Sequence, residues 1–358
     1  MKNLFPLLIL GCVSIFLLVR CNGDEPVEDP KPLINTPPAQ LLSPANQEQF
    51  IIGDDVAVEI KINSAAGIKD LEVRIDDTLY SGGLVVENQT LYIPTDSTSK
   101  VGWTKIVLTY TDSEGKKRSD NRKIVFFSAY TPKNYQATIV NTYPHIKGSY
   151  TQGLEFYEGK LYEGTGQYDR SLLAEVDLTT GTQIRKHDLE GSIFGEGITI
   201  LNDTIYQITY RAKTCFMYDM NFKQIGQYSY DGEGWGLCND GEYLIMSNGD
   251  SEIVWRNRRT FEIVKSIQVF DNQQSVENLN ELELINGNLF VNLYQDTKIA
   301  EVDTATGKVL SYIDCQNIVT DAQDIGNDVL NGIAYNPLTG KMYVTGKLWP
   351  KLYEVKFE

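Results

Sequence analysis

The chain repeats one short motif five times, as Gln152-Gly153-Leu154, Glu196-Gly197-Ile198, Trp235-Gly236-Leu237, Asn280-Glu281-Leu282 and Asn331-Gly332-Ile333. Each motif opens a segment that runs through an apolar strand and a turn into a second strand containing Tyr or Phe. The middle residues of successive motifs lie 44, 39, 45 and 51 positions apart, about the length of one four-stranded propeller blade. The spacing therefore predicts an all-β fold with a five-bladed β-propeller over residues 135–358.

A second motif recurs in the same phase and predicts two further strands with their turns. It reads Ala174-Glu175-Val176-Asp177-Leu178-Thr179-Thr180-Gly181 in the first unit and Ala300-Glu301-Val302-Asp303-Thr304-Ala305-Thr306-Gly307 in the fourth, with Thr and Gly as the turn residues. The last unit ends with the alternating segment Lys351–Phe357 and has one strand fewer than the other units. We expect residues Tyr135–Tyr143 to supply that strand, which would close the ring and remove its exposed edges.

Residues 40–130 have a different pattern, with short segments in which apolar and polar residues alternate. This alternation is typical of half-buried strands, and about seven such strands predict an immunoglobulin-like β-sandwich. There is no cysteine pair of the antibody type and no catalytic motif in this stretch, so we expect a spacer or docking domain. The clearest strands are Val56–Ile62, Leu71–Ile75 and Lys105–Tyr110, and the expected turns are Asp76-Asp77, Ser81-Gly82-Gly83 and Asp112-Ser113-Glu114-Gly115.

The amino-terminal segment has the pattern of an export signal. Lys2 precedes an apolar run from Leu4 to Val19, which is short for a membrane span and typical of a signal-peptide core. Leu18-Val19-Arg20-Cys21 resembles a bacterial lipoprotein box, with Arg20 in place of the usual small residue. We therefore predict a signal peptide over residues 1–21 and lipidation of Cys21. An uncleaved anchor and the weaker box Leu10-Gly11-Cys12 are the alternatives.

Residues 22–39 contain five prolines and several acids, which indicates an extended linker. The linker begins with Asn22-Gly23-Asp24-Glu25, which resembles the acidic surface-export signal of lipoproteins in some Gram-negative bacteria. We predict an exported lipoprotein at the outer membrane or cell surface of such a bacterium. A position facing the periplasm is the alternative.

Charge and residue counts argue against several classes of function. The formal net charge of −16 opposes binding to nucleic acid or anionic lipid, so we expect contact with the membrane only through the lipid anchor. Two histidines, His145 and His187, are too few for a histidine-based metal site. The widely spaced Cys215, Cys238 and Cys315 form neither a zinc pattern nor a disulfide framework, and we expect small buried side chains.

The first residues of the five repeated motifs predict where a ligand would bind. Equivalent positions of the blades surround the central axis, so these side chains should converge at one mouth of the channel. A purely structural repeat would reuse one residue type, whereas amide, acid and aromatic side chains alternate at this position. The variation indicates a ligand pocket, with simple turn closure as the alternative. The five residues are Gln152, Glu196, Trp235, Asn280 and Asn331.

With their neighbours, these motifs resemble the propeller-type glutaminyl cyclases (glutamine cyclotransferases) of plants and bacteria. The resemblance covers about residues 135–358 and leaves the first 130 residues outside. It rests on seven segments in the order of the family: Tyr150-Thr151-Gln152-Gly153-Leu154, Leu161-Tyr162-Glu163-Gly164-Thr165-Gly166, Gly195-Glu196-Gly197-Ile198-Thr199, Gly234-Trp235-Gly236-Leu237, Asn280-Glu281-Leu282-Glu283, Leu330-Asn331-Gly332-Ile333-Ala334 and Val344-Thr345-Gly346-Lys347-Leu348-Trp349-Pro350.

The resemblance implies an enzyme that converts N-terminal glutamine of peptides or proteins into pyroglutamate and releases ammonia. Glu196 falls on the family's catalytic glutamate and is expected to carry the proton from the attacking amine to the leaving ammonia. Lys347 falls on the family's pocket lysine and is expected to stabilise oxyanion charge or to hold a neighbouring carboxylate. A surface turn acid and a solvated lysine are the alternatives. The resemblance implies no required cofactor and no metal in the site, and a structural calcium ion in the propeller channel remains open.

Three side chains are expected to bind substrate through amide groups or apolar packing. Gln152 and Asn280 offer amides to the substrate's backbone and side chain. Trp235 would pack over the short aliphatic chain of the substrate and exclude water, with a place in the core as the alternative. Asn331 is expected to organise its turn rather than touch substrate.

Three tyrosines complete the expected substrate-binding set and depart from the family pattern. Tyr150 stands where the family usually has Phe. Tyr210 and Tyr294 stand where the plant-type enzymes have Trp. Tyrosine keeps an aromatic wall but is smaller and adds a hydroxyl group. We therefore expect the chemistry to persist while the rate or the preference for the residue after glutamine differs.

Two other functions compete with this one. A binding propeller without turnover would capture a peptide or glycan and would not need Glu196 and Lys347 together. A calcium-dependent lactonase or a quinone-dependent dehydrogenase would need several axial carboxylates or a cofactor platform. Only Glu196 is acidic among the five motif starts, although Glu281 follows Asn280.

We expect the protein to be a monomer.

Overall fold

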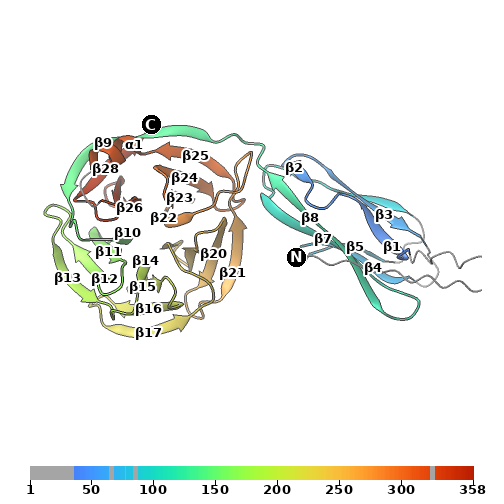
Figure 1. The fold of residues 1–358 in the computed structure, drawn as a ribbon, viewed down its shortest axis with the longest axis horizontal. Coiled ribbons are helices and arrows are strands. Elements are labelled where there is room, and N and C mark those ends of the chain that lie inside the picture. The colour runs from blue at the N-terminus through green and yellow to red at the C-terminus, as the bar shows by residue number, and fades with distance from the viewer. Residues whose placement is uncertain (1–35, 64–67, 77, 84–87, 323–326) are drawn as a thin grey trace, which may run out of the picture. The chain divides into compact units, whose positions relative to one another are not determined.

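The computed structural model describes residues 36–63, 68–76, 78–83, 88–322 and 327–358. The predicted signal peptide, Cys21 and most of the predicted linker lie outside the described residues. Strands dominate the fold, and α1 (Gln316–Ala322) is the only helix in the described ranges (Figure 1). The all-β class is therefore confirmed. Over the same ranges, no helix is long and apolar enough to pass through a membrane.

Residues 39–127 form two sheets that share one apolar core. Strand alternation decides which side chains enter it, so Val56, Val58 and Ile60 are all buried. One sheet has the strand order β1 (Ala39–Ser43), β3 (Val56–Ile62), β6 (Gln89–Ile93). The other sheet has the order β2 (Gln49–Ile51), β8 (Lys117–Phe127), β7 (Gly102–Thr111), β4 (Lys69–Ile75), β5 (Thr78–Gly83).

One expected turn in this region is wrong. Ser81-Gly82-Gly83 lies inside β5, where Gly82 pairs with Glu72 of β4. Glycine weakens a strand but does not prevent its hydrogen bonding at the edge of a sheet, and β5 is an edge strand. The expected turn at 112–115 is confirmed, because the Asp112 carboxylate accepts hydrogen bonds from the backbone amides of Glu114 and Lys116 between β7 and β8.

Residues 133–357 form four further sheets, which Figure 1 shows side by side around a common centre; we call them the ring. Three sheets have four strands each in chain order, and the fourth has eight strands in the order β22, β23, β24, β25, β9, β28, β27, β26. The bounds are β9 (Lys133–Pro144), β10 (Thr151–Tyr157), β11 (Lys160–Thr165), β12 (Leu172–Val176), β13 (Gln183–Asp188), β14 (Gly195–Leu201), β15 (Thr204–Thr209), β16 (Thr214–Asp219), β17 (Gln224–Ser229), β18 (Leu237–Asn239), β19 (Tyr243–Ser247), β20 (Glu252–Asn257), β21 (Ile263–Gln268), β22 (Leu279–Ile285), β23 (Asn288–Leu293), β24 (Lys298–Asp303), β25 (Val309–Asp314), β26 (Leu330–Asn336), β27 (Lys341–Gly346) and β28 (Lys351–Phe357).

The ring is closed by strands from opposite ends of this region. The inner strands β10, β14, β18, β22 and β26 contact one another in cyclic order, and β26 contacts β10. Residues Tyr135–Tyr143 lie in β9, which pairs antiparallel with β28 and, at its start, parallel with β25. The predicted pairing of this segment with the last strand is confirmed.

The second repeated motif folds into a tight turn at both of its occurrences. Asp177 directly follows β12 and accepts hydrogen bonds from the backbone amides of Thr179 and Thr180, and Gly181 follows with φ +69°. At the other occurrence Gly307 has φ +81°, and a Cβ there would lie 2.0 Å from the Gln268 carbonyl oxygen. Glycine is required by both the backbone angle and the close approach.

Three carboxyl groups, of which Glu155 and Glu281 are buried and Glu283 is half-buried, join the inner strands across the centre of the ring. Glu155 of β10 accepts from the Ile200 amide of β14 at 3.0 Å. Glu281 of β22 accepts from Leu154 at 3.3 Å and from Ile333 at 2.7 Å, and Glu283 accepts from Tyr335 of β26 at 3.2 Å. Inner strands are sheet edges whose amides would otherwise lack partners. Glu196 is the acid among the five motif starts, as expected, and these three carboxyl groups lie further along the inner strands.

Burial and mutual repulsion determine the protonation of these carboxyls. Burial raises the pKa of Glu155 to about 8. Burial, together with the charge of Glu155, also raises the pKa values of Glu281 and Glu283 well above their usual range. Neutral carboxyls can satisfy strand amides without placing several charges in the core.

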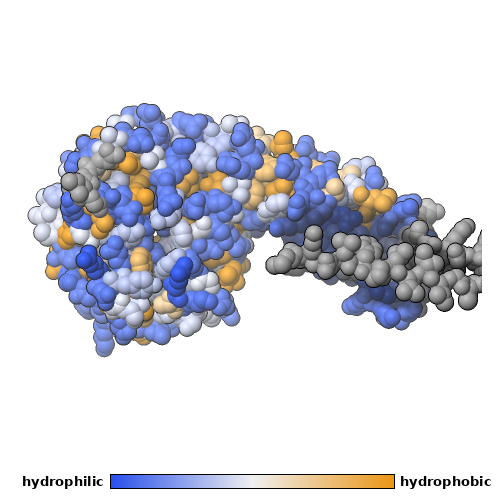
Figure 2. All heavy atoms as spheres, in the orientation of Figure 1, coloured by the Kyte–Doolittle hydropathy of each residue, from blue (hydrophilic) through white to orange (hydrophobic). Residues whose placement is uncertain are grey.

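The face of the ring seen in Figure 2 is mostly hydrophilic, with apolar side chains scattered among polar ones. This distribution agrees with a net charge of −16.

Candidate active site

A cavity of about 160 Å³ lies among the starts of the inner strands. Sites for drug-sized ligands are larger, at roughly 300–1,000 Å³, so this cavity suits a single amino-acid side chain. It brings together every catalytic and substrate-binding residue expected from the sequence, and it adds Phe194. The lining residues are Tyr150, Gln152, Phe194, Glu196, Tyr210, Trp235, Asn280, Tyr294 and Lys347.

Strand starts and strand ends position the polar residues of the cavity. Gln152, Glu196 and Asn280 are each the second residue of an inner strand, in β10, β14 and β22. Lys347 directly follows β27. Trp235 precedes its strand, because β18 is short and begins at Leu237, yet the Trp235 carbonyl still accepts from the Gly197 amide at 2.8 Å.

Glu196 and Lys347 contribute the carboxyl group and the amino group of the cavity lining and are only 4% and 3% exposed. Burial raises the pKa of Glu196 well above its usual value; the Lys347 charge opposes this rise and the Glu233 charge adds to it. Burial lowers the pKa of Lys347, against the charges of Glu196 and Asp328. Among the described residues, neither side chain has a hydrogen-bond partner. Both are therefore available to a bound molecule.

The Lys347 ammonium group is held by aromatic faces. Its Nζ atom lies 4.9 Å from the centre of the Tyr150 ring and 5.0 Å from that of Tyr294, both within cation–π range. Burial and the Asp328 carboxylate raise the pKa of Tyr150, so its hydroxyl stays protonated and can donate.

Two amide side chains contribute differently to the cavity. The Asn280 Oδ1 atom is buried and has no hydrogen-bond partner in the described structure, so it can accept from a ligand N–H. Gln152 is held in place, because the Asn331 Nδ2 group donates to Gln152 Oε1 at 3.2 Å and to the Thr151 carbonyl at 2.9 Å. Asn331 does not line the cavity; it orients its neighbours, in line with the role expected for it.

Aromatic rings make up the wall. Phe194 contacts Tyr150 edge-on, with ring centres 6.1 Å apart, and lies 5.9 Å from Tyr210. Trp235 and Tyr294 meet at 5.4 Å and 83°. Edge-to-face geometry of this kind is favourable for ring pairs. The wall therefore presents ring surfaces to one side of the cavity.

The position of Trp235 depends on a glycine and a carboxylate. Gly249 has φ +91°, and a Cβ there would lie 2.6 Å from the Trp235 ring. The indole N–H of Trp235 donates to Glu233 at 3.3 Å. Arg211 donates to the other Glu233 oxygen at 3.2 Å and to the Tyr210 hydroxyl at 3.1 Å. One network thus links Trp235 and Tyr210 at the rim.

Sequence reasoning missed Phe194, and a signal was available. Phe194 lies two positions before Glu196, and alternate residues of an extended segment point to the same side. The phenylalanine is therefore placed to line the same cavity. Gly166 leaves it room, since a Cβ at Gly166 would lie 2.4 Å from the Phe194 ring.

The cysteines and histidines, for which no catalytic role is expected, do not line the cavity. Cys215, Cys238 and Cys315 are free and buried, as expected. His187 packs against the Tyr218 ring at 5.1 Å, and His145 is buried behind the cavity wall. In the described part of the chain, no three His, Cys, Asp or Glu side chains converge closely enough to hold a metal ion.

Comparison with known proteins adds three findings. A family model described as glutamine cyclotransferase matches residues 106–357. The glutaminyl-peptide cyclotransferase of Arabidopsis thaliana is 35% identical over 227 residues, which cover 62% of this chain and 71% of that protein. The crystal structure of Myxococcus xanthus glutaminyl cyclase matches with a TM-score of 0.60 and 33% identity, over 63% of this chain and 98% of that one. All nine cavity-lining residues fall within the range of the family match.

Proposed function

The chain belongs to the glutamine cyclotransferase family, and from this premise we propose that it converts the N-terminal glutamine of a peptide or protein into pyroglutamate with release of ammonia. The observation that carries the proposal is the small cavity in which the unpaired Glu196 and Lys347 face amide and aromatic side chains.

The reaction needs one new bond and one broken bond within a single residue. The uncharged α-amine of the substrate attacks the Cδ atom of its own γ-amide, which gives a five-membered tetrahedral intermediate. The C–N bond to the amide nitrogen then breaks, and ammonia leaves. Because both reacting groups are already joined, the enzyme has to fold the side chain back and move protons. A cavity that fits one side chain suits this task.

Glu196 is the proposed proton carrier. As a carboxylate it takes a proton from the attacking nitrogen, and as a carboxylic acid it returns that proton to the leaving nitrogen. A catalytic pKa near the working pH favours both transfers. Burial raises the pKa of Glu196 well above its usual acidic range.

The remaining side chains position substrate and stabilise charge. Lys347 is proposed to stabilise the oxyanion on the former amide oxygen. The free Asn280 Oδ1 accepts from the α-amine or amide of the substrate. Trp235 and Tyr294 cover the aliphatic chain. We propose that turnover needs no cofactor and no metal. A structural calcium ion in the central channel remains an open alternative.

The fold proposal is a five-bladed β-propeller at residues 135–358, preceded by an immunoglobulin-like sandwich at residues 40–130. Five inner strands in cyclic contact support the propeller. The eight-stranded sheet then corresponds to two blades that β9 joins edge to edge. Two sheets over a single core support the sandwich, which we propose to be a spacer or docking domain.

The test is ammonia release from Gln-initiated dipeptides by purified residues 22–358. We expect turnover by the wild type, persistence of turnover with a chelator present, and loss of turnover in Glu196→Gln. Absence of activity in the wild type, or full activity in Glu196→Gln, would overturn the assignment. A protein that binds the peptides without releasing ammonia would instead support the alternative of a binding propeller.

We further propose that Cys21 is lipidated and tethers a monomer to the outer membrane or cell surface, with a periplasmic orientation as the alternative. The support is the sequence pattern of residues 1–39, outside the described structure. Labelled palmitate should enter the wild type and not Cys21→Ala. Labelling of both proteins would overturn the assignment of Cys21.

A further inference from the structure

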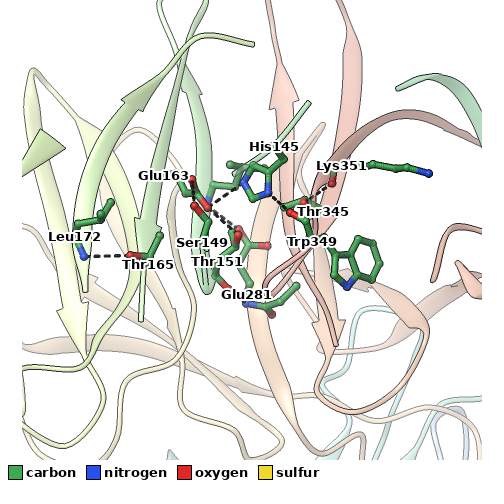
Figure 3. Close-up of polar contacts among 12 residues, drawn as sticks. His145, Ser149, Thr151, Glu163, Thr165, Leu172, Glu281, Thr345, Trp349 and Lys351 are labelled. Carbon is green, nitrogen blue, oxygen red and sulfur yellow. Dashed lines mark hydrogen bonds and ion pairs between the residues drawn. The ribbon is translucent and has the colours of Figure 1, made fainter. Parts of the chain in front are cut away.

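Behind the cavity wall, four buried side chains form a hydrogen-bonded group (Figure 3). Glu163 Oε1 accepts from the Thr151 hydroxyl at 2.7 Å, and Glu163 Oε2 accepts from the Ser149 hydroxyl at 3.2 Å. His145 Nε2 lies 3.1 Å from Glu163 Oε1. The side chains of His145 and Glu163 are only 2% and 0% exposed. We call these four residues the Glu163 cluster.

The partners of His145 determine its protonation. Its Nδ1 atom lies 2.8 Å from the Trp349 carbonyl oxygen, which can only accept. Its Nε2 atom faces the Glu163 carboxylate, which already accepts two hydroxyl groups. A ring with protons on both nitrogens satisfies both partners. Burial disfavours this ion, but the Glu163 charge and the two hydrogen bonds outweigh burial and raise the pKa of His145.

On one side, the cluster holds the turn that carries Lys347. Besides the ring contact to Trp349, the His145 amide donates to the Pro350 carbonyl at 2.9 Å, and the Leu348 amide donates to the Ser149 carbonyl at 2.7 Å. Leu348 has φ +63°, an unfavourable angle for leucine that the surrounding contacts must maintain. Hydrogen bonds to the segment that contains His145 and Ser149 therefore hold the backbone directly after Lys347 in place.

On the other side, the cluster holds the start of β10. Ser149 and Thr151 point to Glu163, whereas the alternate residues Tyr150 and Gln152 line the cavity. Successive side chains of an extended segment point to opposite sides. The hydrogen bonds of Ser149 and Thr151 to Glu163 therefore orient Tyr150 and Gln152 toward the cavity.

We propose that His145 and Glu163 are positioning residues for cyclisation, which set Lys347 and Gln152 relative to each other across the junction between the first and last sheets of the ring. This inference rests on the proposed function. Neither residue lines the cavity, so neither touches the reacting atoms. A displacement of about 1 Å at a reacting group can lower a rate about 100-fold, so the fixed geometry matters for turnover.

The first test uses matched variants of the cluster. Thr151→Val removes the hydroxyl with little change of shape, and Thr151→Ser retains it. We expect Thr151→Val to raise KM about tenfold through Gln152, and Thr151→Ser to restore the wild-type value. His145→Gln acts on the Lys347 turn, and we expect it to lower kcat about 10- to 100-fold.

A control separates positioning from general loss of stability. Glu301 also accepts from a serine hydroxyl, Ser311 at 2.6 Å, and from the Asn288 amide group at 2.8 Å, but it lies in β24 and lines no part of the cavity. We expect Glu301→Gln to lower the melting temperature with kcat and KM within twofold of the wild type. Glu163→Gln should change both kinetic constants at temperatures where it is fully folded.

A spectroscopic measurement tests the charge state independently of activity. The chain has two histidines, so a His187→Gln variant assigns the His145 ring resonances in an NMR titration. We expect His145 to titrate above the usual value of about 6.5 and its midpoint to fall in Glu163→Gln.

The combined results discriminate among the hypotheses. Wild-type kinetics in Thr151→Val and His145→Gln, or losses equalled by Glu301→Gln, would overturn the positioning role even if the wild type is active. An unshifted His145 would overturn the charged pair. A wild type that releases no ammonia would instead remove the proposed function, and the titration would still report on the pair.

Discussion

The ammonium group of Lys347 lies 5.0 Å from the centre of the Tyr294 ring, at a position where plant-type relatives are expected to carry tryptophan. Cation–π contacts are worth about 0.5–2 kcal/mol. Tyr294→Leu should therefore lower kcat/KM about 2- to 30-fold, whereas Tyr294→Phe keeps the ring face and should stay within about threefold. Steady-state ammonia release distinguishes the two. Equal losses in both variants would mean that the Tyr294 hydroxyl group, which both variants lack, matters for turnover rather than the ring face.

Replacing Lys347 should affect the pH profile as well as the rate. The Lys347 charge opposes the rise in the pKa of Glu196. In Lys347→Met that pKa should rise further, so the acidic limb of kcat/KM should move to higher pH. Loss of one charge-stabilising group should also lower kcat about 100- to 1,000-fold. An unmoved limb would mean that Glu196 is not the titrating group.

The contact between Gly249 and Trp235 predicts a remote effect on the wall. Gly249→Ala would place a methyl group against the indole on a backbone with φ +91°. Trp235 would have to shift, so we expect a KM increase of roughly tenfold, about 1.4 kcal/mol, and a modest loss of stability. Gly241→Ala is the control, because Gly241 has φ +89° but open space around its Cβ position. It should lose stability without a change in KM.

The inner carboxyls predict a pH-dependent stability. The pKa of Glu155 rises from about 4.5 in the unfolded chain to about 8 in the folded protein, so between these values the folded state binds more protons. Stability therefore falls as the pH rises through this window, by at most about 1.4 kcal/mol per pH unit for one group. Glu155→Gln removes this dependence.

Urea unfolding at pH 5 and pH 8 measures the effect. Relative to the wild type, Glu155→Gln should be more stable against unfolding at pH 8 than at pH 5. A difference that is the same at both pH values would contradict the raised pKa.

Local patterns predicted a large part of this protein. The all-β class, the strand bounds Val56–Ile62 and the pairing of residues 135–143 with the last strand follow from alternation and repeat spacing. The expected pocket residues meet in one cavity because equivalent positions of repeated units face the same centre. These features depend on periodicity, which one sequence displays directly.

Features that depend on tertiary contacts were missed. Glu155 and Glu283 look like ordinary strand acids until the inner strands bring their amides within reach. The contact between Glu163 and His145 joins a residue of β11 to one that directly follows β9, and no spacing rule links them. Gly82 shows the opposite error: its turn signal was strong, but pairing with Glu72 in β4 overrode it.

The pairing of β9 with β28 also bears on how the protein is made. Thr138 bonds to Glu358 across 220 positions, and contacts of such long range form slowly. During synthesis, the part of β9 that pairs with β28 stays unpaired until this last strand has emerged. Lys347 lies between β27 and this last strand, so the cavity would be completed only late in synthesis. An unfinished chain would thus lack a complete cavity, and the exposed β9 edge would be the part most in need of a chaperone.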